Sequence, residues 1–280
     1  MDNELFFSGG TLAGYALTGT VYLLVPLAAA FLLYRYRAFR LIPLLTGIAV
    51  YFLAVRFCDV FTGIVFNRQA LAVQTAMAAG FVGIFEESGR YFAVKCPIFG
   101  IRSDAAAFSY AVGHAGLECM IRCGQNYHIF DIGRRLNANG IGSFLVDRTA
   151  ERTAEITETL NRYAEQSLAL GILDSLGVIT NFGVHLALTL LIYRKLREGV
   201  HPVRWLGIAC LLHFSLNDLY LSTGVLGGEM FASLMSIFWG VGIIVLVWKI
   251  VNGNTVLDNI RYQMADSDGY PVESTEGRDG

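Results

Sequence analysis

Four apolar stretches of the chain each carry a pair of polar residues whose types and spacing could do chemistry. The pairs are Glu86/Arg90, His114/Glu118, Asn181/His185 and His213/Asn217. Members of a pair are four residues apart, so they share one face if the stretch is a helix. Ionisable side chains inside an apolar membrane helix are costly and usually functional. The pattern therefore predicts a buried site built from several helices.

The depth of these residues within their stretches is nearly equal. Four side chains lie nine or ten residues from the charged residue that ends the stretch: Glu86, His114, His185 and His213. The charged residues from which we count are Lys95, Asp104, Arg194 and Arg204. At about 1.5 Å per residue, all four side chains lie roughly 14 Å from the same membrane face, near the midplane. Two stretches run inward and two outward, so chain direction does not explain the agreement, and we expect one polar layer.

Three imidazoles and a carboxylate in one layer suit two hydrolytic chemistries. In the first, His114, His185 and His213 bind Zn²⁺, and a water molecule fills the open fourth position. Glu86 or Glu87 would then take a proton from that water. In the second, no metal binds: a buried glutamate activates water directly, and a histidine stabilises the tetrahedral intermediate. The number of histidines favours the metal.

A second polar layer follows about 6 Å farther along the helices and contains Glu118, Asn181 and Asn217. These side chains would orient the imidazoles or hold an oxyanion, and Glu118 is also a candidate metal ligand. Structural alternatives exist for single residues, because a lone buried histidine is often only a packing residue. Glu87 and Arg90 could form a structural ion pair.

The composition requires a lipid environment for much of the chain. Of its 280 residues, 54% are hydrophobic and 16% charged, whereas the charged share of a soluble domain is about 25%. The formal net charge is −2 and no basic face is concentrated anywhere, which excludes nucleic acid as a partner. The bilayer itself is the expected partner, and a cell membrane the expected location.

Seven stretches are long and apolar enough for a helix that crosses a bilayer. They cover about 11–34, 41–66, 71–94, 104–123, 174–193, 204–222 and 230–250. Lys and Arg gather in alternate connections, which predicts the N-terminus outside and the C-terminus in the cytoplasm. The fold class is therefore all-α, a polytopic membrane bundle of about seven transmembrane helices.

We expect a single domain over residues 1–250. The long connection at 124–173 contains an amphipathic segment at about 144–168, which predicts a helix outside the membrane or on its surface. Residues 251–280 are polar, with a Gly-rich end, and predict a disordered cytoplasmic tail.

Three motifs resemble those of a known family. Glu86-Glu87-Ser88-Gly89-Arg90 resembles the EExxR signature of membrane-embedded proteases, Gly113–Glu118 resembles a GHGxxE segment, and His213–Asp218 resembles an HxxxN/D segment. In their order and spacing they resemble the YhfC-type intramembrane metalloproteases, which are distant relatives of the CAAX-prenyl and PrsW-like proteases. The chain departs from the pattern at Ala115, where the family often has glycine.

The resemblance implies a peptidase that cuts a peptide or membrane-protein substrate. It assigns Glu86 and Glu87 as catalytic acidic residues and His114 and His213 as their essential partners. His185, in its Gly-x-His-Leu-Ala context, is similar to a further histidine of the family.

Two other functions remain open at this point. A seven-span zinc lipid amidase of the ceramidase type would share the histidines and the outside N-terminus, but it would not need the EExxR run. A transporter or a haem-binding membrane protein could use His185 and His213, as axial ligands in the haem case. The paired carboxylates Glu86 and Glu87 would then have no purpose.

Overall fold

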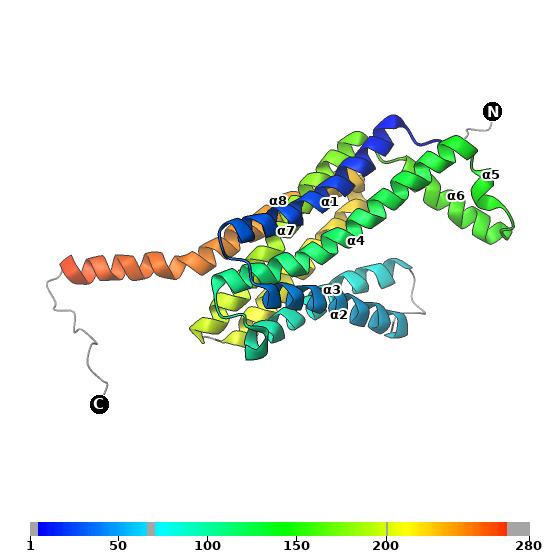
Figure 1. Cartoon of the computed structure of the whole chain (residues 1–280). Helices are drawn as coiled ribbons and strands as arrows, with labels where there is room; N and C mark the ends of the chain where they lie inside the picture. The colour runs from blue at the N-terminus through cyan, green and yellow to red at the C-terminus, as the bar shows by residue number, and fades with distance from the viewer. Residues whose placement is uncertain (1–4, 66–70, 200, 268–280) are drawn as a thin grey trace.

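The computed structural model describes residues 5–65, 71–199 and 201–267, and within these ranges the chain is helical without strands. The helices are α1 (Gly9–Arg35), α2 (Leu41–Val65), α3 (Leu71–Lys95), the short 3₁₀ helix η1 (Pro97–Phe99), α4 (Asp104–Asn139), α5 (Gly142–Leu145), α6 (Ala150–Ala164), α7 (Leu168–Glu198) and α8 (Pro202–Ser267). Figure 1 shows the long helices side by side, with α6 beyond one end of the bundle.

Hydroxyl side chains define where four of these helices begin. Ser8, Ser103, Thr149 and Ser167 each accept a hydrogen bond from a backbone N–H of the first turn of α1, α4, α6 and α7. Such N-caps satisfy a donor that has no partner within the helix.

Four helical segments of the described chain are long and apolar enough to cross a membrane: Gly9–Arg35, Leu41–Val65, Leu168–Glu198 and Gly227–Gly253. They support an integral membrane protein. The count of seven spans and the direction of insertion stay predictions. Two of the helices outside this set, α3 and α4, carry much of the polar layer, which lowers their apolar character.

Helix α4 is longer than the sequence predicts. We expected a span that ends near residue 123, but α4 continues to Asn139. Its last turns pack against the start of α1, where the side chain of Asn137 bonds both the N–H and the carbonyl of Phe7, at 2.9 and 2.8 Å. The amphipathic helix α6 lies within the range 144–168, with Leu160 as its buried residue.

Helix α8 contains two helical segments joined at Gly228. This residue has φ 79° and ψ 172°, a conformation that is open almost only to glycine. The expected sixth and seventh spans therefore follow each other without a loop. The second segment continues to Ser267, past the expected boundary at 250, and residues 268–280 of the predicted tail lie outside the described residues.

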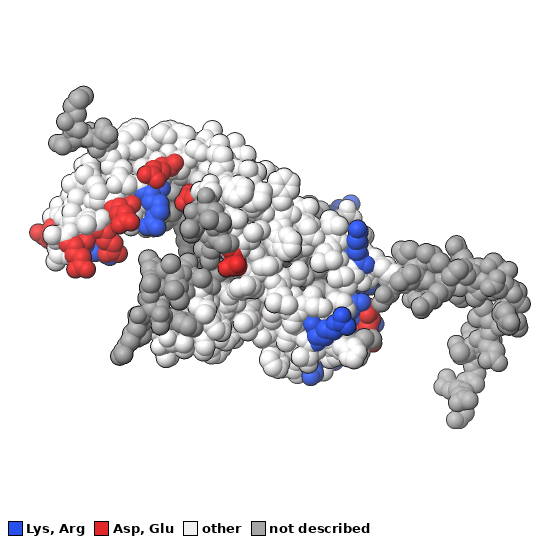
Figure 2. All heavy atoms as spheres, turned by 180° about the vertical axis from the view of Figure 1, so that it is seen from behind, with Lys and Arg blue, Asp and Glu red and all other residues white. Residues whose placement is uncertain are grey.

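The bundle has two chemically different ends, as Figure 2 shows. At the basic end, α1 and α7 finish, α4 starts, and Arg194 forms an ion pair with Asp104. At the acidic end, which includes the glutamates of α6, α1 and α7 start and α4 finishes. There the hydroxyl of Thr11 donates to the carbonyl of Ala164 at 3.3 Å, and that of Thr18 donates to the carbonyl of Gly171 at 3.0 Å.

Candidate functional site

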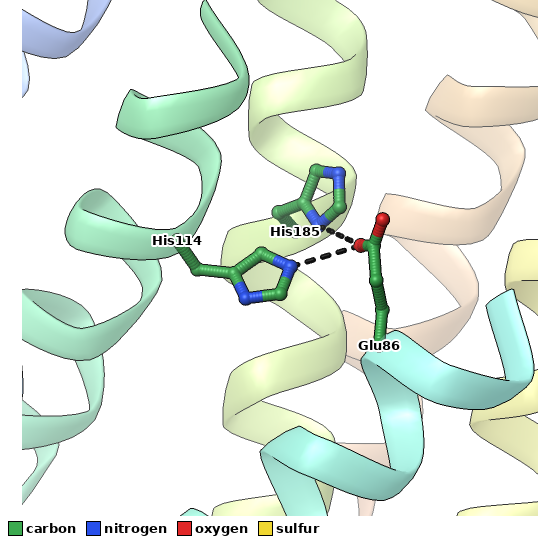
Figure 3. Close-up of side chains that lie close together, drawn as sticks. All are labelled: Glu86, His114 and His185. Atoms are coloured by element: carbon green, nitrogen blue, oxygen red, sulfur yellow. Dashed lines mark hydrogen bonds and ion pairs between the residues drawn. The ribbon is translucent and has the colours of Figure 1, made fainter. Parts of the chain in front are cut away.

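Four helices bring one polar residue each to a common point inside the bundle. Glu86 comes from α3, His114 from α4, His185 from α7 and His213 from α8. All four are buried, with at most 4% of the residue surface exposed. Figure 3 shows Glu86 between the imidazoles of His114 and His185. The structure thus brings together the four residues that residue counting placed in one layer.

One carboxylate oxygen is the centre of this cluster. Glu86 Oε2 lies 2.9 Å from Nε2 of His114, 3.9 Å from Nδ1 of His185 and 4.0 Å from Nε2 of His213. The other oxygen of Glu86 points away from the two imidazoles drawn in Figure 3. Three ring nitrogens from three helices therefore surround a single buried carboxylate.

Two tyrosines hold the imidazole of His114, and the sequence reasoning missed both. The ring of Tyr51 meets it edge-on at 5.3 Å, and that of Tyr110 stacks on it at 5.9 Å. Tyr110 precedes His114 by one helical turn, so the spacing of four residues could have revealed it. Tyr51 comes from α2, and no local pattern in the sequence points to it.

Glycines allow α4 to approach α2 closely enough for this contact. A Cβ atom on Gly113 would lie 2.0 Å from the carbonyl oxygen of Leu44, and one on Gly47 would lie 2.1 Å from that of Tyr110. Neither position has room for a side chain. Backbone packing between the two helices thus sets the position of the neighbouring His114.

The second glutamate of the motif has a different environment. Glu87 Oε1 lies 2.9 Å from Nδ1 of His213 and forms an ion pair with Arg90, whose side chain is completely buried. A carboxylate that binds one ring nitrogen of a histidine fixes the ring and directs the other nitrogen. In His213 that other nitrogen is Nε2, which faces Glu86. The contacts of Glu87 therefore suit an orienting residue.

Arg90 also determines the tautomer of His185. Its Nη2 lies 3.0 Å from Nδ1 of His185, and since arginine only donates, Nδ1 is the acceptor. The proton then resides on Nε2, which donates to Glu118 Oε2 at 3.1 Å. Asn181 donates to the same oxygen at 3.3 Å. Glu118 thus contacts Nε2 of His185, the ring nitrogen farther from Glu86, and lies outside the cluster around Glu86.

A polar cavity of about 740 Å³ reaches this cluster. Glu86 and His213 line it, together with Glu118, Asn181 and Asn217 of the second layer. Glu87 and Arg90 do not line it. Of the two adjacent glutamates, Glu86 is therefore the one that water in the cavity can reach.

The donor set fits a divalent metal ion. Glu86, His114 and His185 each offer a ligand atom, and the three atoms lie within 4.8 Å of one another. Tetrahedral zinc with bonds near 2.1 Å separates its ligand atoms by about 3.4 Å. The separations of 2.9 and 3.9 Å from Glu86 to the two imidazoles are close to this value. For His185 to use Nδ1, its hydrogen bond with Arg90 must open.

The fold and the site define a helical integral membrane protein with a buried carboxylate–imidazole centre. The family model of the YhfC intramembrane metalloproteases matches residues 21–237, so the chain belongs to this family. No curated protein and no solved structure matches the chain.

Proposed function

We propose that the protein hydrolyses a peptide bond of a membrane-associated substrate, with Glu86 as the general base. The observation that carries this proposal is the convergence of three imidazoles on Glu86 Oε2 next to a polar cavity. Membership of a family of intramembrane metalloproteases supports peptide-bond hydrolysis over lipid-amide hydrolysis, electron transfer or transport.

The proposed reaction begins with a water molecule in the cavity. Glu86 accepts a proton from this water, and the water oxygen attacks the carbonyl carbon of the scissile peptide bond. The proton then passes from Glu86 to the leaving nitrogen, and the carbon–nitrogen bond breaks. The product carboxylic acid and amine together contain all atoms of the substrate and the water.

The developing negative charge on the carbonyl oxygen needs donors at the same place. His213 directs Nε2 toward the Glu86 carboxylate because Glu87 holds its Nδ1, and in its protonated form this nitrogen donates to the oxyanion. Asn217, which follows His213 by one turn and lines the cavity, supplies a second donor. Arg90 acts through Glu87 and is a positioning residue.

We further propose a divalent ion, most simply zinc, as a resident cofactor. His114 and His185 would hold it through ring nitrogens and Glu86 through Oε2, which would leave the second oxygen of Glu86 to accept the proton; His213 lies beside them. When bound, such an ion polarises a carbonyl and makes water a stronger acid. Purified protein should then contain close to one equivalent of zinc, and the variant His114→Ala should contain much less. Active protein without metal would exclude this part of the proposal.

The decisive experiment compares the membrane proteomes of cells that carry the wild type or Glu86→Gln. We expect shortened membrane proteins in the wild type and their full-length precursors in the variant, because glutamine cannot take the proton. The matched control is Glu158→Gln on the exposed face of α6, which should behave as wild type. If no protein changes and a lipid species does, the protease proposal is wrong.

A further inference from the structure

The cavity that reaches Glu86 extends in only one direction. In α4, the described residues that line it all follow His114, from Glu118 to Ile129. In α7, the lining residues all precede His185, from Asp174 to Asn181. Both sets lead toward the acidic end of the bundle, where α4 finishes and α7 starts. Asp174 is eleven residues before His185, so the cavity continues about 16 Å beyond the cluster.

Toward the basic end, the bundle is closed by apolar packing. Leu188, Leu191 and Ile192 of α7 are at most 1% exposed and belong to a large apolar cluster with α8. Tyr110 and Tyr193 form a second cluster with Ala107. Of the described residues of these clusters, Leu216 alone lines the cavity, and it follows His213 along α8, on the side of the acidic end.

The cavity lining has the chemistry that an extended peptide requires. A substrate strand in a membrane must have partners for its backbone N–H and carbonyl groups. Side-chain amides and hydroxyls can both donate and accept, and the cavity contains Gln125, Asn126, Asn181, Asn217, Ser233 and Ser236.

We infer that this cavity is the substrate-binding site, and that water and an extended peptide segment reach Glu86 from the acidic end. Because the basic end is expected in the cytoplasm, the site is open to the extracytoplasmic side. The inference about the substrate rests on the proposed function. The inference about the side from which water enters the cavity does not.

Cysteine labelling tests the inference without a known substrate. In a background with the five native cysteines replaced, Gly177→Cys places a thiol in the cavity, where a Cβ atom would meet nothing within 4 Å. Ser236→Cys does the same from α8. A membrane-impermeant maleimide added to intact cells should label most of the protein at both positions. It should label little in inverted membrane vesicles.

Two control positions on α7 bracket these sites. Leu176→Cys lies next to Gly177 but on the outward side of the helix, where lipid keeps the thiol unreactive. Thr189→Cys lies one turn beyond His185, within the sealed half, and its residue is completely buried. Both should label at least tenfold less than Gly177→Cys.

The outcomes separate this inference from the proposed function. Labelling of the cavity positions only from the cytoplasmic side, or from neither side, overturns it. If labelling succeeds, a bulky maleimide on Gly177→Cys should also abolish the Glu86-dependent shortening of membrane proteins. The Leu176→Cys variant, treated in the same way, should still shorten them. Labelling without that loss would show that the cavity is hydrated but does not hold the substrate. Should Glu86→Gln leave the proteome unchanged, the labelling result still stands alone.

Discussion

Two helices of this protein carry glutamate and arginine three residues apart, and the two pairs have opposite environments. In α3, the ion pair between Glu87 and Arg90 is completely buried. In α6, Nη1 of Arg152 lies 2.5 Å from Oε2 of Glu155, and more than half of each side chain is exposed. The spacing is the same, so the difference comes from what surrounds each helix. Burial forces the first pair to satisfy its charge inside the protein, where it also contacts His185 and His213.

The largest effect should follow when one charge of the buried pair is removed. Glu87→Gln leaves Arg90 buried without its counter-charge, and we expect the free energy of unfolding to fall by about 3–5 kcal/mol. Reversible unfolding in lipid bicelles measures it. The double variant Glu87→Gln/Arg90→Gln, without either charge, should recover much of the loss. A single variant as stable as the wild type would contradict the buried ion pair.

The close packing of α4 against α2, next to His114, can be broken separately. Gly113→Ala places a methyl group 2.0 Å from the carbonyl oxygen of Leu44, and we expect a loss of about 1–3 kcal/mol. The matched control is Gly124→Ala in the same helix, where a Cβ atom meets nothing within 4 Å. This second variant should be as stable as the wild type, or up to about 1 kcal/mol more stable. Equal effects of the two substitutions would refute the close approach of α2 and α4.

A smaller effect, on rate, should come from the residue that supports His185. Glu118→Gln keeps the shape of the side chain but removes the carboxylate that accepts from His185 Nε2. We expect the proposed Glu86-dependent proteolysis to slow by about 10- to 100-fold, as for other residues that orient a metal-binding imidazole. The thermal midpoint in detergent should change little. A variant that loses stability and rate together would indicate a structural role.

The smallest effect belongs to the exposed pair on α6. Arg152→Gln removes an ion pair that water screens, and the free energy of unfolding should change by at most about 1 kcal/mol. Added salt should reduce even this difference. Reversible unfolding in lipid bicelles, as for Glu87→Gln, measures both variants on one scale. A loss of stability in Arg152→Gln as large as that in Glu87→Gln would show that α6 is packed against another surface.

Much of the site could be predicted from the sequence because depth along a helix is a local property. Each residue advances a helix by about 1.5 Å, so counting from the charged ends placed Glu86, His114, His185 and His213 in one layer. The structure brings these four side chains together. The helical class was predictable for a similar reason, since lipid leaves the backbone few alternatives.

The division of roles between Glu86 and Glu87 was decided only by the tertiary structure. Neighbouring residues in a helix point in directions about 100° apart. Which of them faces the cavity therefore depends on how α3 is rotated against α4, α7 and α8. Packing of large and small side chains between helices sets that rotation, and no local pattern encodes it. The same packing brings Tyr51 to His114 from a helix that the motifs do not include.

The length of the helices and the direction of the cavity also depend on contacts distant in sequence. Asn137 helps hold the end of α4 through Phe7, 130 residues away, so a window of local hydropathy ended the helix too early. By itself, the sequence determined the apolar, membrane-type character of the chain, its helical class and the common position of the polar layer along the helices, because these follow from composition and from the rise of a helix. Only the tertiary structure decided which of the two glutamates lines the cavity and toward which end of the bundle the cavity extends, because both depend on how helices distant in sequence pack together.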